Sequence, residues 1–442
     1  MYGRFIYNAL QRECYGLATN LLFSINFSTF VPMKVLYNIA MGCYNTAVAA
    51  VSPWYEKARL WRNGRKGLFE HMEKSIDTDS PIVWIHVASL GEFEQGRPII
   101  EKIKAERPEY KIVLTFYSPS GYEIRKNYQG ADYIFYLPLD TVANARRFLD
   151  IAKPEIAIFV KYEYWINFLS ELKTRNIRTY IVSAIFRSNS IFFRPFGEMW
   201  REALDTFEIL FVQDENSKQL LSKLGCDNVI VAGDTRFDRV AQIAAAAKKI
   251  ELVEQFKGEN RLFVAGSTWG PDEELIVQLA NDNPSVKFII APHEMDESRM
   301  AKIEQSAVGG AVRYTEVANS SLDKQILILD TMGMLSSVYG YAEFSYIGGG
   351  FGVGIHNTLE AATFGLPIAF GPNYQKFKEA RDMISLGAAT SITNYEELKA
   401  WFSPLLSDPQ HLTAVSQISK EYTAKHQGAT DIFFKTVFSK QG

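Results

Sequence analysis

The residues best suited to chemistry are five glycines that lie between residues 348 and 354, followed by Asn357 and Glu360. A predicted strand leads into this segment, and a helix-compatible stretch, residues 358–364, follows it. Glycine lets a backbone approach a ligand closely, and the N-terminus of a helix offers free N–H groups that suit a phosphate. Glu360 is placed to accept hydrogen bonds from ribose hydroxyls. The pattern indicates a nucleotide-binding loop, and its structural alternative is a tight turn beside a solvated glutamate.

A second candidate is Glu92, in the segment Ser89-Leu-Gly-Glu92 at the end of the first predicted strand. A carboxylate in a strand-to-helix turn can act as a general base toward a hydroxyl. Taken alone, Glu92 is better explained as a first-turn acid that complements the helix dipole. Glu163 also follows a predicted strand, and it either orients a substrate or is an exposed loop acid.

Other turns that follow predicted strands carry hydroxyls, glycines or a histidine. They are Ser118-Pro-Ser-Gly121, Gly266-Ser-Thr268, Ala291-Pro-His293 and Asp330-Thr-Met-Gly333. Together they indicate a ligand-binding edge, because the carboxyl ends of parallel strands lie at one edge of a sheet. The six histidines form no ligand cluster, so a catalytic metal is not expected. The segment Ile191-Phe-Phe-Arg-Pro-Phe196 suits a lipid head group or, equally, a packed loop with one solvated arginine.

These turns need strands to position them, and short β-branched and aromatic runs alternate with helical patterns along the chain. The predicted strands are residues 82–89, 111–118, 133–137, 155–161, 179–185, 209–213, 229–232, 262–266, 286–291, 325–329, 344–347 and 367–370. Such alternation is typical of parallel sheets covered by helices. Because 442 residues exceed one ordinary hydrophobic core, we predict an α/β fold of two doubly wound domains whose loops face a shared cleft.

The composition narrows the class of protein. Hydrophobic residues make up 47% of the chain and charged residues 22%, and the formal net charge is -3. These values are typical of a globular protein and provide no overall attraction to nucleic acid. The three cysteines, Cys14, Cys43 and Cys226, match neither a disulfide framework nor a zinc site, so a reducing compartment is expected.

The N-terminal region differs from the rest of the chain. Residues 35–54 are largely apolar and uncharged, which is close to the roughly 20 residues that a spanning helix needs. Five basic residues follow, as expected for a flank facing anionic lipid on the cytoplasmic side: Lys57, Arg59, Arg62, Arg65 and Lys66. We expect residues 33–66 to form a membrane anchor, either spanning or interfacial, with a buried helix as the alternative. Residues 1–32 are interpreted as an upstream extension.

In this order, the motifs resemble those of the 3-deoxy-D-manno-octulosonic acid (Kdo) transferases of Gram-negative lipopolysaccharide synthesis. The resemblance runs from about Met33 to the C-terminus. Besides the N-terminal anchor, it rests on Ser89-Leu-Gly-Glu92, Ser118-Pro-Ser-Gly121, Leu137-Pro-Leu-Asp140, Glu163-Tyr-Trp165, Gly233-Asp-Thr-Arg-Phe-Asp238, Ala265-Gly-Ser-Thr268, Asp330-Thr-Met-Gly333, Gly348-Gly and His356-Asn-Thr-Leu-Glu360.

The resemblance implies a GT-B fold, with an acceptor domain at residues 67–240 and a nucleotide-sugar domain at residues 241–442. It implies transfer of Kdo from CMP-Kdo to a lipid A precursor with inversion, without a metal or cofactor, at the cytoplasmic leaflet of the inner membrane. Glu92 would be the general base. The implied acceptor residues are Ser89, Gly91, Ser118, Ser120 and Glu163. The implied donor residues are Ser267, Thr268, Pro292, His293, Met332, Gly333, Gly348, Gly349, Gly350, Asn357 and Glu360.

Two motifs depart from the family pattern. The usual Ala-Pro-Arg-His is Ala291-Pro-His-Glu294 here, which puts an arginine contact to the nucleotide in doubt. The usual Met-Glu-Thr-Glu is Val160-Lys-Tyr-Glu163, which keeps only the second acid and bears on acceptor handling. The alternatives are another GT-B enzyme, such as a nucleotide-sugar 2-epimerase or a different lipid glycosyltransferase, and a non-catalytic, membrane-tethered protein that binds sugar nucleotides.

Overall fold

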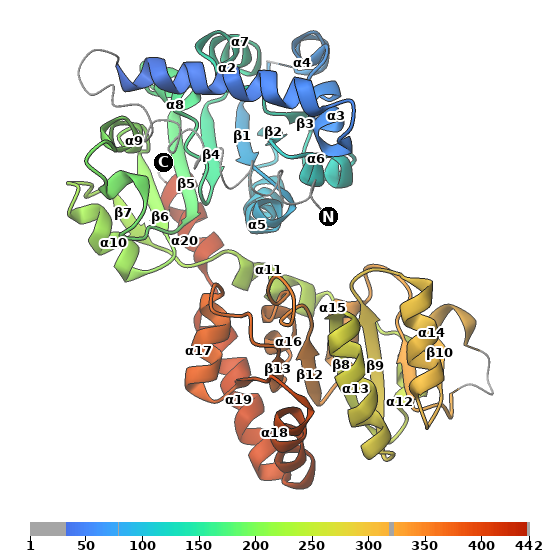
Figure 1. Cartoon of the computed structure of the whole chain (residues 1–442). Coiled ribbons are helices and arrows are strands. Elements are labelled where there is room, and N and C mark those ends of the chain that lie inside the picture. Colours follow the sequence, from blue (N-terminus) through green and yellow to red (C-terminus); the bar gives the residue numbers. More distant parts are fainter. Residues whose placement is uncertain (1–31, 78, 318–321, 440–442) are drawn as a thin grey trace. The chain divides into compact units, whose positions relative to one another are not determined.

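The computed structural model describes residues 32–77, 79–317 and 322–439 (Figure 1). The predicted upstream extension lies outside these ranges except for its last residue. The chain forms two compact units, one that ends at Thr235 and resumes at Gly428, and one that comprises Arg236–Gln427. The sequence places the boundary after residue 240 and assigns all later residues to the second domain. The structure instead returns the last helix to the first unit.

The first unit contains a seven-stranded parallel sheet in the order β3-β2-β1-β4-β5-β6-β7. Its strands are β1 (Ile82–Val87), β2 (Lys111–Phe116), β3 (Tyr133–Tyr136), β4 (Ile156–Val160), β5 (Arg178–Ala184), β6 (Ile209–Val212) and β7 (Val229–Val231). All seven are predicted by the sequence, with ends that differ by one or two residues. The central strands are buried on both faces, which explains why their sequences are apolar runs without alternation.

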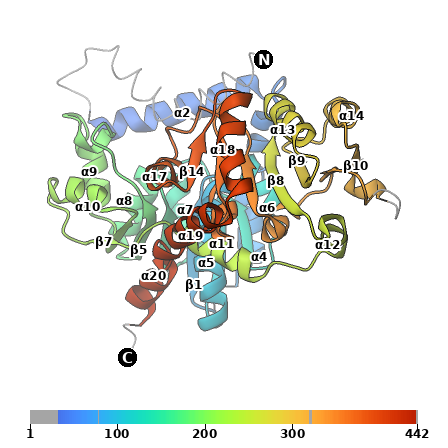
Figure 2. The ribbon, with the colours of Figure 1, turned by 90° about the horizontal axis from the view of Figure 1, so that it is seen from below.

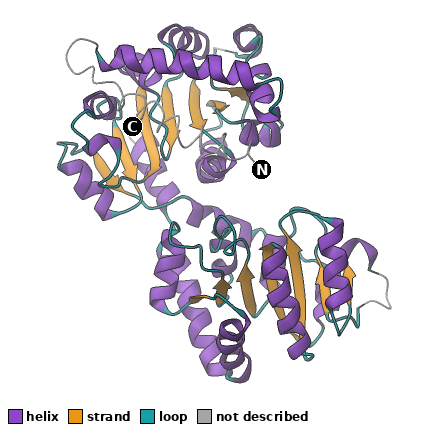
Figure 3. Ribbon diagram, in the orientation of Figure 1, coloured by secondary structure: helices purple, strands orange, loops and turns teal. Residues whose placement is uncertain are grey.

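Helices cover both faces of this sheet (Figure 3). They are α4 (Leu68–Ser75), α5 (Leu90–Glu106), α6 (Pro119–Arg125), α7 (Val142–Ala152), α8 (Ile166–Thr174), α9 (Glu198–Leu204), α10 (Glu215–Ser222) and α20 (Ala429–Phe438). The C-terminal helix α20 lies beside α5 (Figure 2). Phe433 and Phe438 of α20 share a buried cluster with Ile99 and Ile103 of α5, and this burial ties the C-terminus to the first unit.

Two further helices, α2 (Met33–Val51) and α3 (Glu56–Asn63), precede this sheet in the chain. Tyr37 of α2 donates a hydrogen bond of 2.6 Å to the fully buried Asp140, which follows β3. Arg65 differs from the lipid-facing cation that the sequence predicts. Its guanidinium donates to the carbonyl oxygens of Tyr117 and Leu137 and stacks on the Trp61 ring, because those turns leave carbonyls without strand partners. Within the three described ranges, no helix is long and apolar enough to cross a bilayer.

The second unit contains another seven-stranded parallel sheet, in the order β10-β11-β9-β8-β12-β13-β14. Its strands are β8 (Arg261–Thr268), β9 (Val286–Pro292), β10 (Ala311–Arg313), β11 (Ile326–Ile328), β12 (Phe344–Ile347), β13 (Ile368–Phe370) and β14 (Ala389–Ser391). Its helices are α11 (Arg236–Ala245), α12 (Glu251–Lys257), α13 (Gly270–Asp282), α14 (Glu297–Ser306), α15 (Leu335–Val338), α16 (Leu359–Thr363), α17 (Lys378–Leu386), α18 (Tyr395–Ser407) and α19 (Pro409–Lys425). The sequence misses the edge strands β10 and β14, which are short and only partly buried.

Candidate functional site

Glu92 and Ser89 lie at the start of α5, directly after β1, with the spacing of a capping box. The Ser89 hydroxyl accepts a hydrogen bond of 3.3 Å from Gly91 N and donates one to Glu92 Oε2. Glu92 Oε1 has no hydrogen-bond partner within the described ranges. Because α5 begins at Leu90, Pro98 lies inside the helix. Glu92 thus has one oxygen held in place and the other open to a substrate hydroxyl.

The turn after β2 packs against the turn after β1. Ser118 N donates to Ala88 O at 2.8 Å, and the hydroxyls of Ser118 and Ser120 lie 2.9 Å apart. Gly121 permits this contact, since a Cβ there would lie 3.1 Å from the carbonyl carbon of Ser89. The fold therefore brings Ser118 and Ser120 next to the turn that carries the candidate base.

Glu163 follows β4 and is buried, with 6% of its surface exposed, so it is not the exposed loop acid that the sequence allows. Glu163 Oε2 lies 3.1 Å from Nε2 of the fully buried His86. It also accepts a hydrogen bond of 2.7 Å from the Trp165 indole. A buried carboxylate needs such donors, because an unpaired charge in an apolar interior is costly. The structure therefore fixes Glu163 from within the domain.

A chain of hydrogen bonds links the side chains of this buried cluster. The Trp84 indole donates to Thr115 Oγ1 at 2.8 Å, and Thr115 Oγ1 lies 2.9 Å from His86 Nδ1. An indole N–H is only a donor, so Thr115 Oγ1 acts as the acceptor toward Trp84. The Trp165 indole donates to His86 Nε2 at 2.9 Å as well as to Glu163, so Trp84, Thr115 and His86 join Glu163 in one buried network. The sequence misses these three supporting residues; their signal is two polar-tipped side chains, at positions 84 and 86, in an otherwise apolar strand.

In the second unit, the glycine-rich loop follows β12 and is closely packed. A Cβ at Gly348 would lie 2.6 Å from Thr268 Cα, and one at Gly350 would lie equally close to Gly371 Cα. Gly349 has a φ of 91°, and its N–H donates to Asp272 Oδ2 at 3.0 Å. The alternative of a tight, closely packed turn therefore explains part of the glycine pattern. The N–H groups of Gly348 and Gly349 both have acceptors within the protein, so they do not form a free phosphate cradle.

The sequence prediction misses Asp272, which anchors the glycine-rich loop through hydrogen bonds. Besides Gly349, it accepts hydrogen bonds from the Tyr346 hydroxyl at 2.7 Å and from Trp269 N at 2.9 Å. Burial raises the pKa of Asp272, and the hydrogen bonds from Gly349 and Tyr346 oppose that rise. The local signal of this role is its position in the first turn of α13.

Glu360 is held by two neutral donors at the start of α16. Ser336 Oγ donates to Glu360 Oε2 at 2.6 Å, and Asn357 Nδ2 donates to Oε1 at 2.9 Å. Asn357 Oδ1 in turn accepts from the N–H of Leu359, the first residue of α16, at 3.1 Å. Each carboxylate oxygen can accept a further hydrogen bond, which leaves Glu360 able to bind a diol. Ser336 is a contributor that the sequence analysis does not single out.

Two histidines stack beside the glycine-rich loop. The rings of His293, after β9, and His356 lie 4.2 Å apart, and the Trp269 indole donates to His356 Nε2 at 3.2 Å. Burial, assisted by His293, lowers the pKa of His356 to about 4. Burial also lowers the pKa of His293, with Arg299 acting in the same direction. Both rings are therefore neutral near pH 7, and each offers one N–H donor.

The other predicted donor residues have mixed environments. Thr268 is fully buried and its hydroxyl donates to Glu273, so it supports the fold and faces no ligand. Pro292 is buried as the last residue of β9. Ser267 is half-buried with a φ of 54°, and Met332 is highly exposed at the turn that contains Gly333. Of these, only the residues outside the core, Ser267 and Met332, can contact a ligand directly.

Each unit is thus a Rossmann-like domain with polar side chains gathered at the carboxyl edge of a parallel sheet, where such folds bind ligands. Two such domains in one chain define the class of α/β enzymes to which GT-B glycosyltransferases belong. Among the described residues, no group of three or more histidine, cysteine, aspartate or glutamate side chains is arranged to hold a metal ion.

Comparison with known proteins identifies the family. Residues 62–239 match the family model described as 3-deoxy-D-manno-octulosonic-acid transferase (Kdotransferase). The chain is 26% identical over 343 residues to the Kdo transferase of Aquifex aeolicus, covering 76% of this chain and 89% of that protein. It is 28% identical over 374 residues to the Kdo transferase of Bordetella pertussis, covering 79% and 85%.

The fold comparison agrees with the two-domain architecture. The crystal structure of UDP-GlcNAc 2-epimerase from Neisseria meningitidis superimposes with a TM-score of 0.58, covering 81% of this chain and all of that one, at 15% identity. A likeness at this identity shows the fold alone. The matches to Kdo transferases, which are glycosyltransferases, confirm the resemblance predicted from the sequence, and the fold comparison confirms the predicted fold class.

Proposed function

We propose that this enzyme transfers Kdo from CMP-Kdo to a lipid A precursor with inversion, using Glu92 as the general base. The observation that carries the proposal is the state of the Glu92 carboxylate. Ser89 holds Oε2, whereas Oε1 has no partner within the described ranges. The names of the relatives, which are Kdo transferases, support the identity of the transferred sugar.

In the proposed reaction, Glu92 Oε1 accepts the proton of a glucosamine hydroxyl of the acceptor. The hydroxyl oxygen attacks the anomeric carbon of Kdo, and the bond from that carbon to the CMP phosphate oxygen breaks. Inversion follows because the oxygen enters on the face opposite the departing CMP. The hydrogen bond from Ser89 fixes the direction of the Glu92 carboxylate before the reaction.

On the donor side, we assign the ribose of CMP to Glu360, whose two oxygens are oriented by Ser336 and Asn357. The neutral imidazoles of His293 and His356 supply N–H donors for the anionic part of the donor. The proposal uses no metal, since these imidazole N–H donors can stabilise the charge of the leaving phosphate. The packed glycines then serve to bring β12 and α16 close enough for these side chains to act together.

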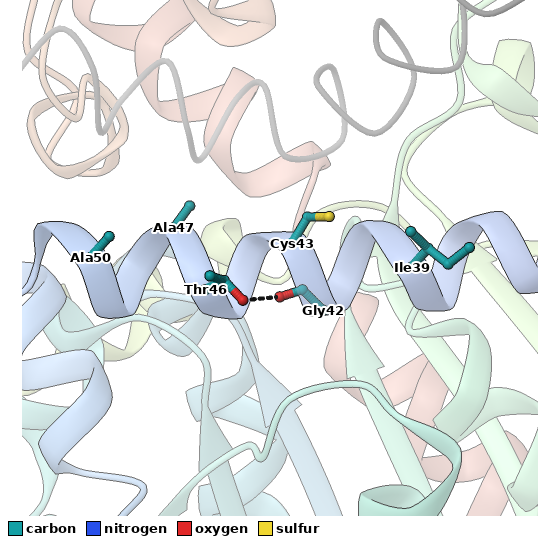
Figure 4. Close-up of a pocket in the computed structure, with 6 residues that line it drawn as sticks. All are labelled: Ile39, Gly42, Cys43, Thr46, Ala47 and Ala50. Carbon is teal, nitrogen blue, oxygen red and sulfur yellow. Dashed lines mark hydrogen bonds between the residues drawn. The ribbon is translucent and has the colours of Figure 1, made fainter.

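We also propose that α2 rests on the cytoplasmic face of the inner membrane. Ile39, Cys43, Ala47 and Ala50 lie along one side of the helix (Figure 4). The hydroxyl of Thr46 on this side donates to the Gly42 carbonyl of the same helix, so it presents no unpaired polar group. This face has the character of an interfacial helix, with its axis parallel to the membrane.

The transfer reaction is tested with membranes that contain the enzyme, incubated with CMP-Kdo and tetraacylated lipid A precursor. Mass spectrometry should show products heavier by one or more Kdo units. Glu92→Ala should lower kcat by roughly 100-fold or more while the protein remains folded. Unchanged turnover by this variant would exclude Glu92 as the base. Cleavage of CMP-Kdo without transfer of Kdo to the acceptor would exclude the proposed transfer reaction.

Membrane docking is tested by flotation with anionic lipid vesicles. Ile39→Asp places a charge on the outer face of α2 and should release most of the protein from the vesicles. The matched control is Ile124→Asp in α6, because these two isoleucines are 56% and 58% exposed. Equal flotation of both variants and the unmodified protein would contradict the docking of α2.

A further inference from the structure

Three cations without ion pairs lie on two adjacent loops at the carboxyl edge of the first sheet. Lys161 directly follows β4, and Arg187 and Arg194 lie on the loop after β5. Strand β4 pairs with β5, and Lys161 N donates to Val182 O at 2.9 Å, so the two loops leave the sheet side by side. We refer to Lys161, Arg187 and Arg194 as the basic triad.

The lack of side-chain partners distinguishes the two arginines of the triad from the other arginines of this domain. Ten arginines lie between residues 67 and 235. Seven of them pair with a carboxylate: Arg97, Arg107, Arg125, Arg146, Arg147, Arg175 and Arg178. Arg201 donates to two backbone carbonyls of the loop after β5. Arg187 and Arg194 are left, and neither has a side-chain partner within the described ranges.

A buried aromatic cluster joins the two loops into one body. The Tyr164 ring lies 4.8 Å from the Phe192 ring and 6.0 Å from the Phe186 ring, and the two phenylalanine rings lie 5.3 Å apart. Phe186 precedes Arg187 in the chain, and Phe192 lies close before Arg194. This packing is the alternative that the sequence allows for residues 191–196. This packing holds the backbone of the triad in place, while Arg187 and Arg194 are exposed and Lys161 is half-buried.

Lys161 has two features that a surface lysine seldom combines. Its φ of 72° is in the left-handed region, which is unfavourable for a residue with a side chain and is concentrated at functional sites. Its ammonium forms no ion pair within the described ranges, and its nearest ring is that of Tyr162 at 5.4 Å. The neighbouring carboxylate, Glu163, is turned inward to His86. The positive charge is therefore left for a ligand.

We propose that the basic triad binds a phosphate group of the acceptor, and this proposal rests on the proposed function. Arginine forks and a lysine ammonium are the side chains that recognise phosphate oxygens. The triad lies at the same carboxyl edge as Glu92, since β4 pairs with β1. A phosphate anchored there would orient the sugar whose hydroxyl Glu92 deprotonates.

The test measures transfer kinetics in neutral detergent, with a bisphosphorylated tetraacyl glucosamine disaccharide and with the same disaccharide lacking phosphates. Lys161→Met and Arg187→Met should each raise the KM for the phosphorylated acceptor by roughly tenfold or more, because each removes a charged hydrogen bond. The KM for CMP-Kdo should stay unchanged, and Lys161→Arg should restore most of the affinity. With the dephosphorylated acceptor, the variants and the unmodified enzyme should have the same KM.

The matched control is Lys153→Met. Lys153 is another lysine with a positive φ, 42°, but it is exposed and precedes β4, so it lies at the opposite edge of the sheet. Its removal should change neither KM. An equal effect of Lys153→Met, or an equal loss with both acceptors, would overturn the proposal.

The test also distinguishes two further outcomes. If the triad variants weaken binding only to phosphatidylglycerol vesicles and leave the acceptor KM in neutral detergent unchanged, the triad serves the bilayer and the proposal is wrong. If the unmodified enzyme transfers no Kdo, the proposed function fails. The triad is then judged by direct binding of the two disaccharides without donor, where only a preference for the phosphorylated form that Arg187→Met abolishes supports it.

Discussion

Asp140 should make the stability of this enzyme depend on pH in a defined direction. Its carboxylate is fully buried beneath α2 and accepts hydrogen bonds from the Tyr37 hydroxyl and from the backbone N–H groups of Asn167 and Phe168. Burial raises its pKa to about 6, and these hydrogen bonds only partly oppose the rise. The folded chain therefore holds this proton more tightly than the unfolded chain, in which the pKa is near 3.8.

The sign and size of the effect follow from linkage. A raised carboxyl pKa stabilises the folded state at low pH, and this contribution is lost as the pH rises through 6. Between pH 5 and pH 7, the loss for this group amounts to about 1 kcal/mol. Asp140→Asn removes the titration and keeps nearly the same shape. The difference in unfolding free energy between the unmodified enzyme and Asp140→Asn should therefore fall by about 1 kcal/mol over this range.

The assay is chemical denaturation in neutral detergent at several pH values, followed by tryptophan fluorescence. Other carboxyl groups titrate in both proteins, so their contributions cancel in the difference. Tyr37→Phe is a second check: it removes one hydrogen bond to the carboxylate and should raise the pKa of Asp140 further. A difference between the two proteins that stays constant from pH 5 to pH 7, or that grows with pH, would refute the argument from burial.

Three other substitutions test individual contacts. Ser89→Ala removes the donor to Glu92 and should lower kcat about tenfold, with about 1 kcal/mol of stability lost through the missing cap, as steady-state kinetics and thermal unfolding can show. Ser336→Ala frees one oxygen of Glu360 and should raise the KM for CMP-Kdo several-fold with little change in kcat. Gly348→Ala forces a methyl group against backbone atoms and should destabilise the second unit by about 2 kcal/mol or more, measured by denaturation.

For each of these three substitutions, a different result would contradict the prediction. An unchanged kcat in Ser89→Ala would mean that the hydroxyl does not direct the carboxylate. A fall in kcat without a change in the KM for CMP-Kdo would show that Ser336 takes no part in nucleotide binding. A Gly348→Ala protein as stable as the unmodified one would show that the loop relaxes without cost.

The sequence by itself determined the features that depend on short-range pattern. Apolar runs without alternation predict the buried parallel strands, because a strand covered on both faces needs apolar residues at every position. The serine and glutamate of Ser89-Leu-Gly-Glu92 predict a helix start after β1, which the structure contains. The order of the motifs predicts the family, which the comparisons confirm. The sequence does not predict the short edge strands β10 and β14, because three partly buried residues show too short a hydrophobic pattern.

Only the tertiary structure decided how these residues are used. Glu163 looks like a loop acid in the sequence, and it is buried because the pairing of β4 with β1 brings His86 against it. Arg65 looks like a membrane cation, and it is held by carbonyl groups of turns far along the chain. The basic triad also depends on two loops that meet through a shared aromatic cluster. Strand order and long-range packing set these contacts, and neither is encoded in the residues next to them in sequence.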